Sequence, residues 1–68
     1  MSSNVYKKLE LTGSSNVSIE DAVQVAITKC AETVKNLGWF EVTEIRGRLN
    51  GSQVEAWQVT VKVGFTVE

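Results

Sequence analysis

Residues 54–68, VEAWQVTVKVGFTVE, alternate between two parities over almost their whole length and decide the fold of this chain. The apolar parity carries Trp57, Val59, Val61, Val63, Phe65 and Val67, and the other carries Gln58, Thr60, Lys62, Gly64 and Thr66. A period of two places successive side chains on opposite sides of a sheet. The pattern therefore predicts a long strand with one apolar and one polar face.

A second strand precedes this one across a tight turn. Asn50–Gly51 predicts a hairpin, because both residue types tolerate positive φ. The stretch WFEVTEIRGRL, residues 39–49, predicts the partner strand, although its apolar residues change parity between Val42 and Ile45. A β-bulge or strong twist near residues 43–47 would reconcile the two parities.

The middle of the chain predicts a helix over residues 18–37. Ser18 is typical of a helix N-cap, and the negative charges of Glu20 and Asp21 suit the positive end of the helix dipole. Gly38 suits the left-handed residue that closes a helix. The apolar side chains recur at threes and fours and form one stripe: Ile19, Val23, Ala26, Ile27, Cys30, Val34 and Leu37.

The first strand is predicted over VYKKLELTG, residues 5–13, and a loop over GSSNVS, residues 13–18. The order is then β-α-β-β, an α+β fold. A right-handed crossover brings the first strand beside the third, which gives a three-stranded antiparallel sheet of order 2-3-1. One helix covers one face of this sheet, so the polar face must meet water, a ligand or another subunit.

The length of 68 residues allows a single domain, residues 1–68, with little margin of stability. With one cysteine and no histidine, neither a disulfide within the chain nor a zinc site can support it, so we expect a homo-oligomer. The interspersed charges, net −1, argue against nucleic-acid binding. No apolar run suits a membrane span or a signal peptide, so we expect a cytoplasmic protein.

The residues predict binding rather than catalysis. Cys30 falls in the apolar stripe of the helix and is interpreted as a core residue. Trp39, Arg46 and Gln58 together offer an aromatic plane, a guanidinium and an amide, which suit a flat heterocycle with a polar edge. The alternative is that Trp39 fills a seam between subunits and Gln58 is an ordinary surface residue.

The chain resembles the dodecin family of small flavin-binding proteins over nearly its whole length. The resemblance rests on VYKKLELTGSS at the start, SIEDAVQ at the helix entry, WFEV at the junction, IRG in the second strand and QVTVKVGF at the end. A tryptophan followed nineteen residues later by a glutamine, in a β-α-β-β chain of this length, is the most specific part of this match.

The resemblance implies a hollow homododecamer that stores flavin, buffers its free concentration and suppresses its photochemistry without turnover. Pairs of flavin rings stack between symmetry-related copies of Trp39, Gln58 bonds the polar edge of the ring, and Arg46 lies near the ligand. The resemblance implies FMN or riboflavin as the cofactor, and coenzyme A as a further ligand of some members. From the residues alone we expect no metal site.

Two positions depart from many bacterial relatives. Gly38 stands where they carry an aspartate before the tryptophan, so a side-chain acceptor near the sugar tail of the ligand is missing. Thr66 stands where they carry an arginine that suits a phosphate, so the chain offers a hydroxyl without a charge and leaves the choice between FMN and riboflavin open. Two other functions stay open beside flavin storage. One is a flavin-dependent redox enzyme, and the other is an interaction module that binds a peptide or a coenzyme without flavin.

Overall fold

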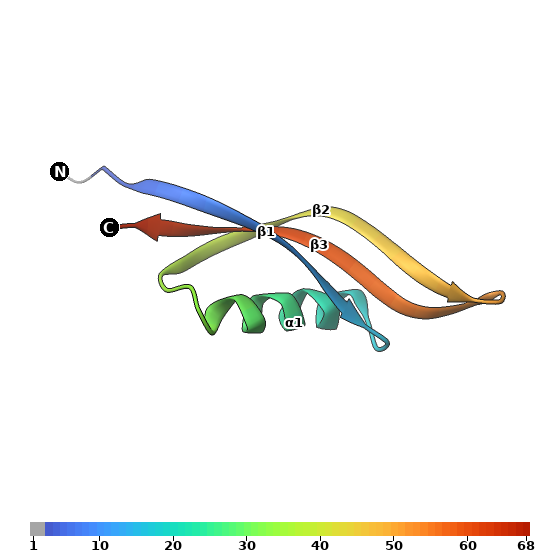
Figure 1. The fold of residues 1–68 in the computed structure, drawn as a ribbon. Helices are drawn as coiled ribbons and strands as arrows, with labels where there is room; N and C mark the ends of the chain where they lie inside the picture. Colours follow the sequence, from blue (N-terminus) through green and yellow to red (C-terminus); the bar gives the residue numbers. More distant parts are fainter. Residues whose placement is uncertain (1–2) are drawn as a thin grey trace.

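The computed structural model describes residues 3–68, so residues 1–2 of the domain predicted over residues 1–68 lie outside it. Its elements follow the predicted order β-α-β-β (Figure 1). They are β1 (Val5–Ser15), α1 (Ile19–Ala31), β2 (Leu37–Asn50) and β3 (Gln53–Val67). The described part is elongated, measuring 55 × 20 × 14 Å.

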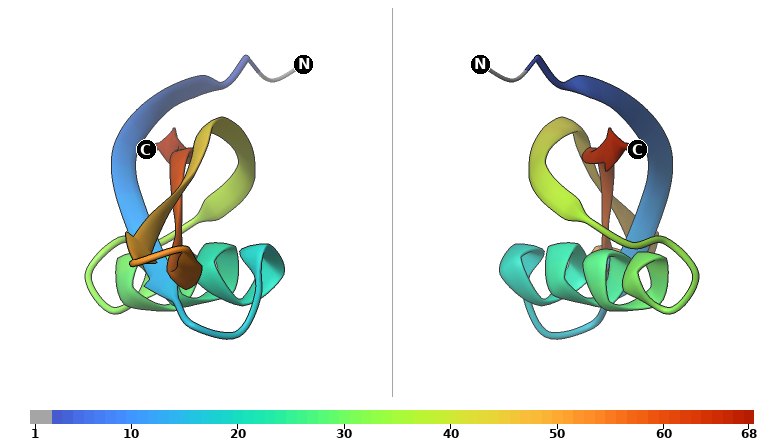
Figure 2. Two further views of the ribbon diagram at one scale, coloured as in Figure 1. Left: turned by 90° about the vertical axis from the view of Figure 1, so that its right-hand side faces the viewer. Right: turned by 90° about the vertical axis from the view of Figure 1, so that its left-hand side faces the viewer.

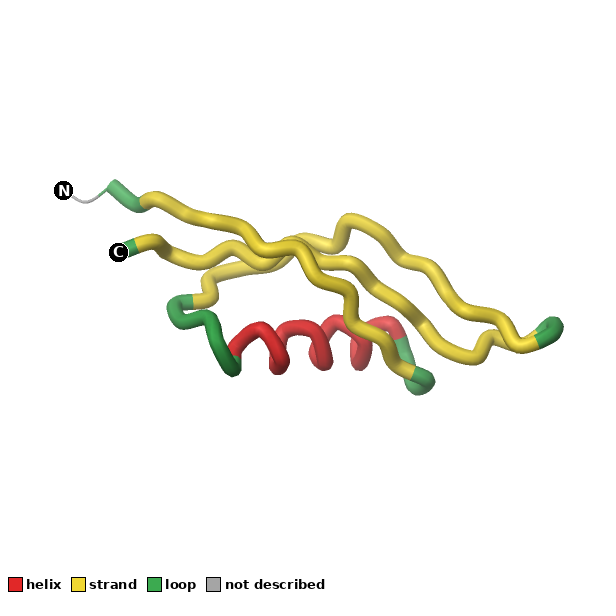
Figure 3. The backbone as a smooth tube through the Cα atoms, in the orientation of Figure 1, coloured by secondary structure: helices red, strands yellow, loops and turns green. Residues whose placement is uncertain are grey.

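The three strands form one antiparallel sheet in the order β1-β3-β2, which confirms the predicted topology (Figure 3). β3 lies in the centre and pairs with β1 on one side and β2 on the other. Because β1 ends opposite Trp57, the turn end of the β2–β3 hairpin extends beyond β1 and the helix (Figure 1).

The helix covers one face of the sheet, here called the helix face, and leaves the other face uncovered (Figure 2). The apolar parity of β3 packs against α1, and Val59, Val61 and Val63 are each at most 1% exposed. The cluster of buried residues consists of Ala22, Ala26, Cys30, Val59, Val61 and Val63. Its largest fully buried side chains are valines, each worth about 1.5–3 kcal/mol on burial, so the core of a lone chain is small.

The start of α1 confirms the predicted cap, and its end corrects the predicted boundary. The backbone N–H of Asp21 donates to Ser18 Oγ over 3.0 Å. The helix ends at Ala31 rather than at residue 37, and its final turn tightens through bonds such as Thr33 N–H to the Cys30 carbonyl. Asn36, with φ 65°, is the left-handed residue, so the role predicted for Gly38 was wrong.

A physical reason explains the early end of the helix. β2 must begin at Leu37 to pair with Phe65, and the segment before it must turn back toward the sheet. Val34 and Leu37 still pack against the core, so they continue the apolar spacing without continuing the helix. The Thr66 N–H donates to the Asn36 carbonyl over 3.2 Å and ties this turn to β3.

The hairpin turn and the first strand differ in detail from the prediction. In the turn only Gly51 has positive φ, 65°, whereas Asn50 still pairs with Gln53 in the sheet. One positive φ at the first central position is typical of a type II′ turn.

β1 continues to Ser15, so the loop after it is shorter than predicted. The Ser15 hydroxyl donates to Asp21 Oδ2 over 2.6 Å and accepts from Val17 N–H.

The register of β2 against β3 confirms the predicted bulge. The pairing shifts between Val42 and Glu44, which leaves Thr43 as the extra residue. A second shift near the turn leaves Glu55 as the extra residue of β3. Between these two bulges the pairing of β2 with β3 is shifted by one residue relative to the pairing at the turn. This shift places each β2 side chain of this segment on the face opposite to the one that an uninterrupted hairpin would give it.

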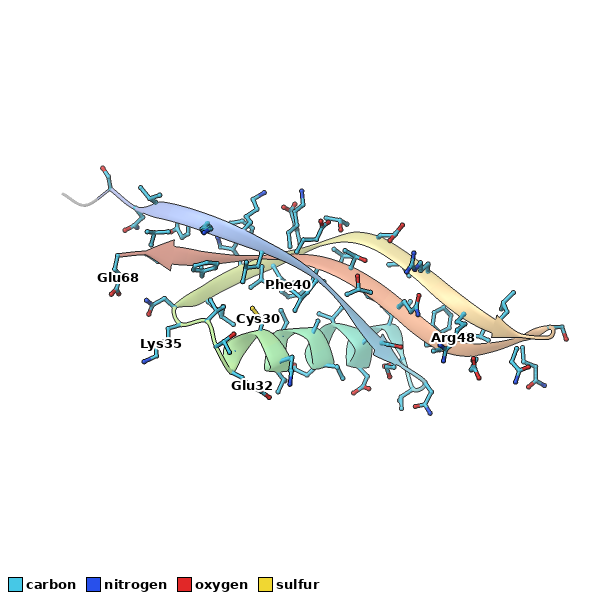
Figure 4. The ribbon with its side chains drawn as sticks, viewed as in Figure 1. Cys30, Glu32, Lys35, Phe40, Arg48 and Glu68 are labelled. Carbon is cyan, nitrogen blue, oxygen red and sulfur yellow. The ribbon has the colours of Figure 1, made fainter. Side chains whose placement is uncertain are left out.

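The helix leaves part of the helix face open over β2. Phe40, Val42 and Ile45 pair with the buried valines of β3 but are 50%, 43% and 53% exposed. Figure 4 shows Phe40 on the helix side of the sheet. A groove between α1 and β2 is lined mainly by apolar side chains, among them Ile19, Val23 and Phe40. This edge of the molecule therefore presents apolar surface that residues 3–68 leave uncovered.

Candidate binding face

The face of the sheet opposite α1, here called the open face, holds all four predicted site residues. Alternation and strand register place on it Tyr6, Lys8, Glu10 and Thr12 of β1, Gln58, Thr60, Lys62, Gly64 and Thr66 of β3, and Trp39, Glu41, Glu44 and Arg46 of β2. These side chains are mostly polar or charged, and the aromatic rings of Tyr6 and Trp39 lie at one end of the face.

Trp39 is opposite Gly64 and lies across it. A methyl group built on Gly64 would fall far inside van der Waals distance of Cε2 and Cζ2 of the indole, and 2.7 Å from Cδ2. The ring therefore rests on the bare backbone of β3 with one face inward. Because the side chain is 39% exposed, the other face is accessible from outside the sheet.

Two residues of β1 lie beside this ring. The centroid of Tyr6 is 6.2 Å from that of Trp39, at an interplanar angle of 59°, a tilted aromatic pair. Lys8 Nζ lies 5.5 Å from the indole centroid, within the range of a cation–π contact. The indole thus has the ring of Tyr6 beside it and the ammonium of Lys8 over it.

Lys8 also binds an acidic residue across the sheet. Its Nζ donates to Glu41 Oε1 over 3.0 Å, and both side chains are half exposed. The hydrogen bond and the positive charge of Lys8, with a smaller effect of Lys62, hold the pKa of Glu41 below its usual 4.5. The ion pair keeps the ammonium near the ring of Trp39.

Arg46 and Gln58 form the second part of the open face. They pair directly across the hairpin, and Arg46 Nε donates to Gln58 Oε1 over 2.9 Å. Arg46 Nη1 also lies 4.0 Å from Glu44 Oε1. This register depends on the bulges, because an uninterrupted hairpin from the Asn50–Gln53 pair would place Arg46 opposite Trp57, on the helix face.

The structure separates the predicted residues into two groups within one chain. Gly64, beneath Trp39, and Gln58 are six residues apart on β3, roughly 20 Å at the usual rise per residue. Thr66 lies at the Trp39 end, opposite Tyr6. A fused three-ring heterocycle is shorter than this separation, so a ring centred over Trp39 does not lie beside the Gln58 of the same chain.

Sequence reasoning missed the neighbours that define the surroundings of Trp39: Tyr6, Lys8, Glu41 and Gly64. Tyr6 and Lys8 occupy the polar parity of the first strand, and the predicted strand order places that strand beside β3. The sequence did not give the register of β1 and β2 against β3, which places Tyr6 and Lys8 next to Trp39.

The described residues add little that suggests other chemistry. Cys30 is 5% exposed within the core, which confirms its interpretation as a core residue. Among residues 3–68, no three His, Cys, Asp or Glu side chains gather as a metal site would require. The helix of this described part is too short and polar to cross a membrane.

Comparison with known proteins identifies the family. The Dodecin family model matches residues 5–68. The chain belongs to the dodecin family. The dodecin of Thermus thermophilus is 45% identical over 64 residues, which cover 94% of this chain and 93% of that relative.

Solved structures of other dodecins share the fold. The dodecin of Streptomyces coelicolor is 41% identical and superposes with a TM-score of 0.94, over 100% of this chain and 97% of that one. A crystal structure of a Thermus thermophilus protein is 44% identical, with a TM-score of 0.92 over 97% of both chains. The present chain is therefore a dodecin in sequence and in fold.

Proposed function

We propose that this dodecin binds flavin and holds it without turnover, as a store that also protects the cell from flavin photochemistry. The observation that supports this most is the indole of Trp39, held on the open face with one ring face accessible. The isoalloxazine ring stacks on that face. Stacking of this kind on a base-sized ring is worth about 1–3 kcal/mol, by analogy with nucleobases.

The binding site forms between copies of the chain. Trp39 and Gln58 of one chain are too far apart for one ring, so the Gln58 amide that bonds the polar edge of the ring comes from another copy. Two rings stack between two copies of Trp39 related by a two-fold axis. The uncovered apolar groove between α1 and β2, together with the small core, supports assembly, which we propose to be a hollow homododecamer.

The ligand is FMN or riboflavin. Thr66 offers a hydroxyl near the Trp39 end but no charge, whereas Lys8 supplies an ammonium beside the indole. A phosphate on the ligand is therefore compatible with this end of the open face. Arg46, at the far end of the same face, lies near the ligand of a neighbouring copy. Coenzyme A is a further ligand to be tested.

Contact with the indole accounts for photoprotection. The electron-rich indole of Trp39, held in van der Waals contact, would supply one electron to a photoexcited ring and take it back, so that neither ring would change overall. Emission and reaction with oxygen are thereby suppressed, and no net chemistry takes place.

A fluorescence titration tests the proposal. FMN, riboflavin and lumichrome are each titrated with the protein, and quenching is expected at micromolar concentrations or below. Trp39→Ala should weaken binding at least tenfold. Trp57→Phe, which alters the other tryptophan on the helix face, should bind as the wild type does.

Two results would contradict the proposal. Equal affinity of the wild type and Trp39→Ala would exclude stacking on this indole, and an absence of quenching by any flavin would favour an interaction module. Steady NAD(P)H oxidation by the flavin-loaded protein would indicate a redox enzyme instead.

A further inference from the structure

We propose that Gly64 is a positioning residue for ligand binding, because its missing side chain sets the height and tilt of the Trp39 indole. The inference rests on the proposed function, since it assigns the residue that makes the stacking plane usable. It acts through Trp39 and requires no contact between Gly64 and the ligand.

The geometry under the indole supports this assignment. The three atoms nearest to a methyl group built on Gly64 are Cε2, Cζ2 and Cδ2 of Trp39. Cδ2 and Cε2 form the bond shared by the two rings of the indole. The glycine backbone therefore lies beneath the middle of the ring system, where it supports the whole plane.

Gly64 is also the one open-face residue of β3 between Gln58 and Thr66 that has no side chain. The open-face positions of β3 from Gln58 to Thr66 otherwise carry the side chains of Thr60 and Lys62. Any of these side chains at position 64 would occupy the space of the indole. Only glycine lets a ring from β2 lie across the central strand.

The neighbours of the indole limit where a displaced ring could go. Tyr6 lies beside it on the same face, and the ammonium of Lys8, paired with Glu41, lies over the ring. A methyl group at position 64 would push the ring until the contact reached an ordinary distance of 3.4 Å or more, and this movement is directed away from the sheet. The indole would then occupy the space of the first stacked ring.

The same displacement acts twice in a symmetric site. If two copies of Trp39 face each other across a two-fold axis, each indole that rises from its sheet narrows the space between them. Gly64 therefore sets the thickness of the stack that this space accepts, and the ligand class it selects is a pair of flat heteroaromatic rings.

A double-mutant cycle tests the coupling of Gly64 to Trp39. FMN affinity is measured for the wild type, Gly64→Ala, Trp39→Ala and the double variant. We expect Gly64→Ala to lower the affinity at least tenfold in the wild-type background and less than twofold in the Trp39→Ala background. An equal loss in both backgrounds, or no loss in either, would overturn the proposal.

Gly38→Ala is the matched control. A methyl group there would meet only the Gly64 carbonyl oxygen at 3.7 Å, an ordinary contact, although the residue adjoins Trp39. It should bind FMN within twofold of the wild type. A tenfold loss in this variant too would show that this region tolerates no added methyl group, which contradicts a specific role of Gly64.

A measurement without flavin separates this inference from the proposed function. In the Trp57→Phe background Trp39 is the sole tryptophan. Adding Gly64→Ala should raise the acrylamide quenching constant of the indole, because a raised ring is more exposed. An unchanged quenching constant overturns the inference even if the wild type binds flavin.

A second variant covers the case in which Gly64→Ala does not fold. The double variant with Trp39→Ala should then fold, because the indole that collides with the added methyl group is gone. Failure of the double variant to fold would also overturn the inference.

Discussion

Two glycines, one on each face of the sheet, make opposite contacts. Gly13 lies on the helix face, and a methyl group there would collide with the backbone carbonyl of Ala22 and come 3.0 Å from Ala26 Cβ. Gly64 lies on the open face, and its methyl group would collide with the side chain of Trp39. A backbone cannot move aside, whereas a side chain can. The first glycine therefore serves the fold, and in our proposal the second serves ligand binding.

The two faces of the sheet differ in whether the chain itself packs against them. The helix face is closed over β3 by internal packing, with Val59, Val61 and Val63 at most 1% exposed. On the open face no second layer formed by residues 3–68 covers the side chains from Trp39 to Gln58. The residues of the helix face are constrained by their neighbours in the chain, and we propose that those of the open face are constrained by a ligand.

The largest effect is expected from Gly13→Ala. The added methyl group forces α1 away from β1, and overpacking against a backbone should cost about 3 kcal/mol of the free energy of unfolding. Urea denaturation at pH 7 measures this cost. Gly38→Ala serves as the control, with a change within about 0.5 kcal/mol. If Gly13→Ala were as stable as Gly64→Ala, the contrast between the two faces would be wrong.

A moderate effect is expected from Gln58→Ala, on binding alone. Loss of one hydrogen bond to the ring should weaken FMN binding roughly threefold to tenfold, which corresponds to about 1 kcal/mol. Gln53→Ala, the same substitution at an exposed position of β3 beside the hairpin turn, should leave the affinity unchanged. Isothermal titration of both variants measures this. A Gln58→Ala variant that lost stability but kept its affinity would assign Gln58 to the fold.

The elements and their order could be predicted from alternation, from the helical stripe and from the Ser18 cap. The end of the helix could not, because Val34 and Leu37 keep the helical spacing while the backbone turns toward β2. An apolar residue that packs on the core looks the same in sequence whether or not its backbone is helical.

The arrangement of the open face could also be predicted only in part. The parity change between Val42 and Ile45 predicted one bulge, but the compensating bulge at Glu55 leaves no comparable signal. Both are needed to place Arg46 beside Gln58 while Trp39 lies over Gly64. The strand and the face of each of the four candidate residues could therefore be predicted, but their separation into two groups required the register.

The smallest effect concerns the ion pair at the edge of the indole. Because Lys8 lowers the pKa of Glu41, Glu41 contributes a little stability above pH 4.5, which is lost as the pH falls below that value. Lys8→Met should raise the pKa of Glu41 toward 4.5, and Lys62→Met should raise it less. Carboxyl chemical shifts in an NMR titration measure both. An unchanged pKa in Lys8→Met would mean that the ion pair does not persist in solution.

The most direct test is a crystal structure of the protein grown with FMN. It should show the isoalloxazine in van der Waals contact with the face of the Trp39 indole that points away from Gly64, and the Gln58 of another copy at the polar edge of the ring. A structure in which protein covers that face of Trp39, with FMN bound elsewhere or absent, would contradict the account.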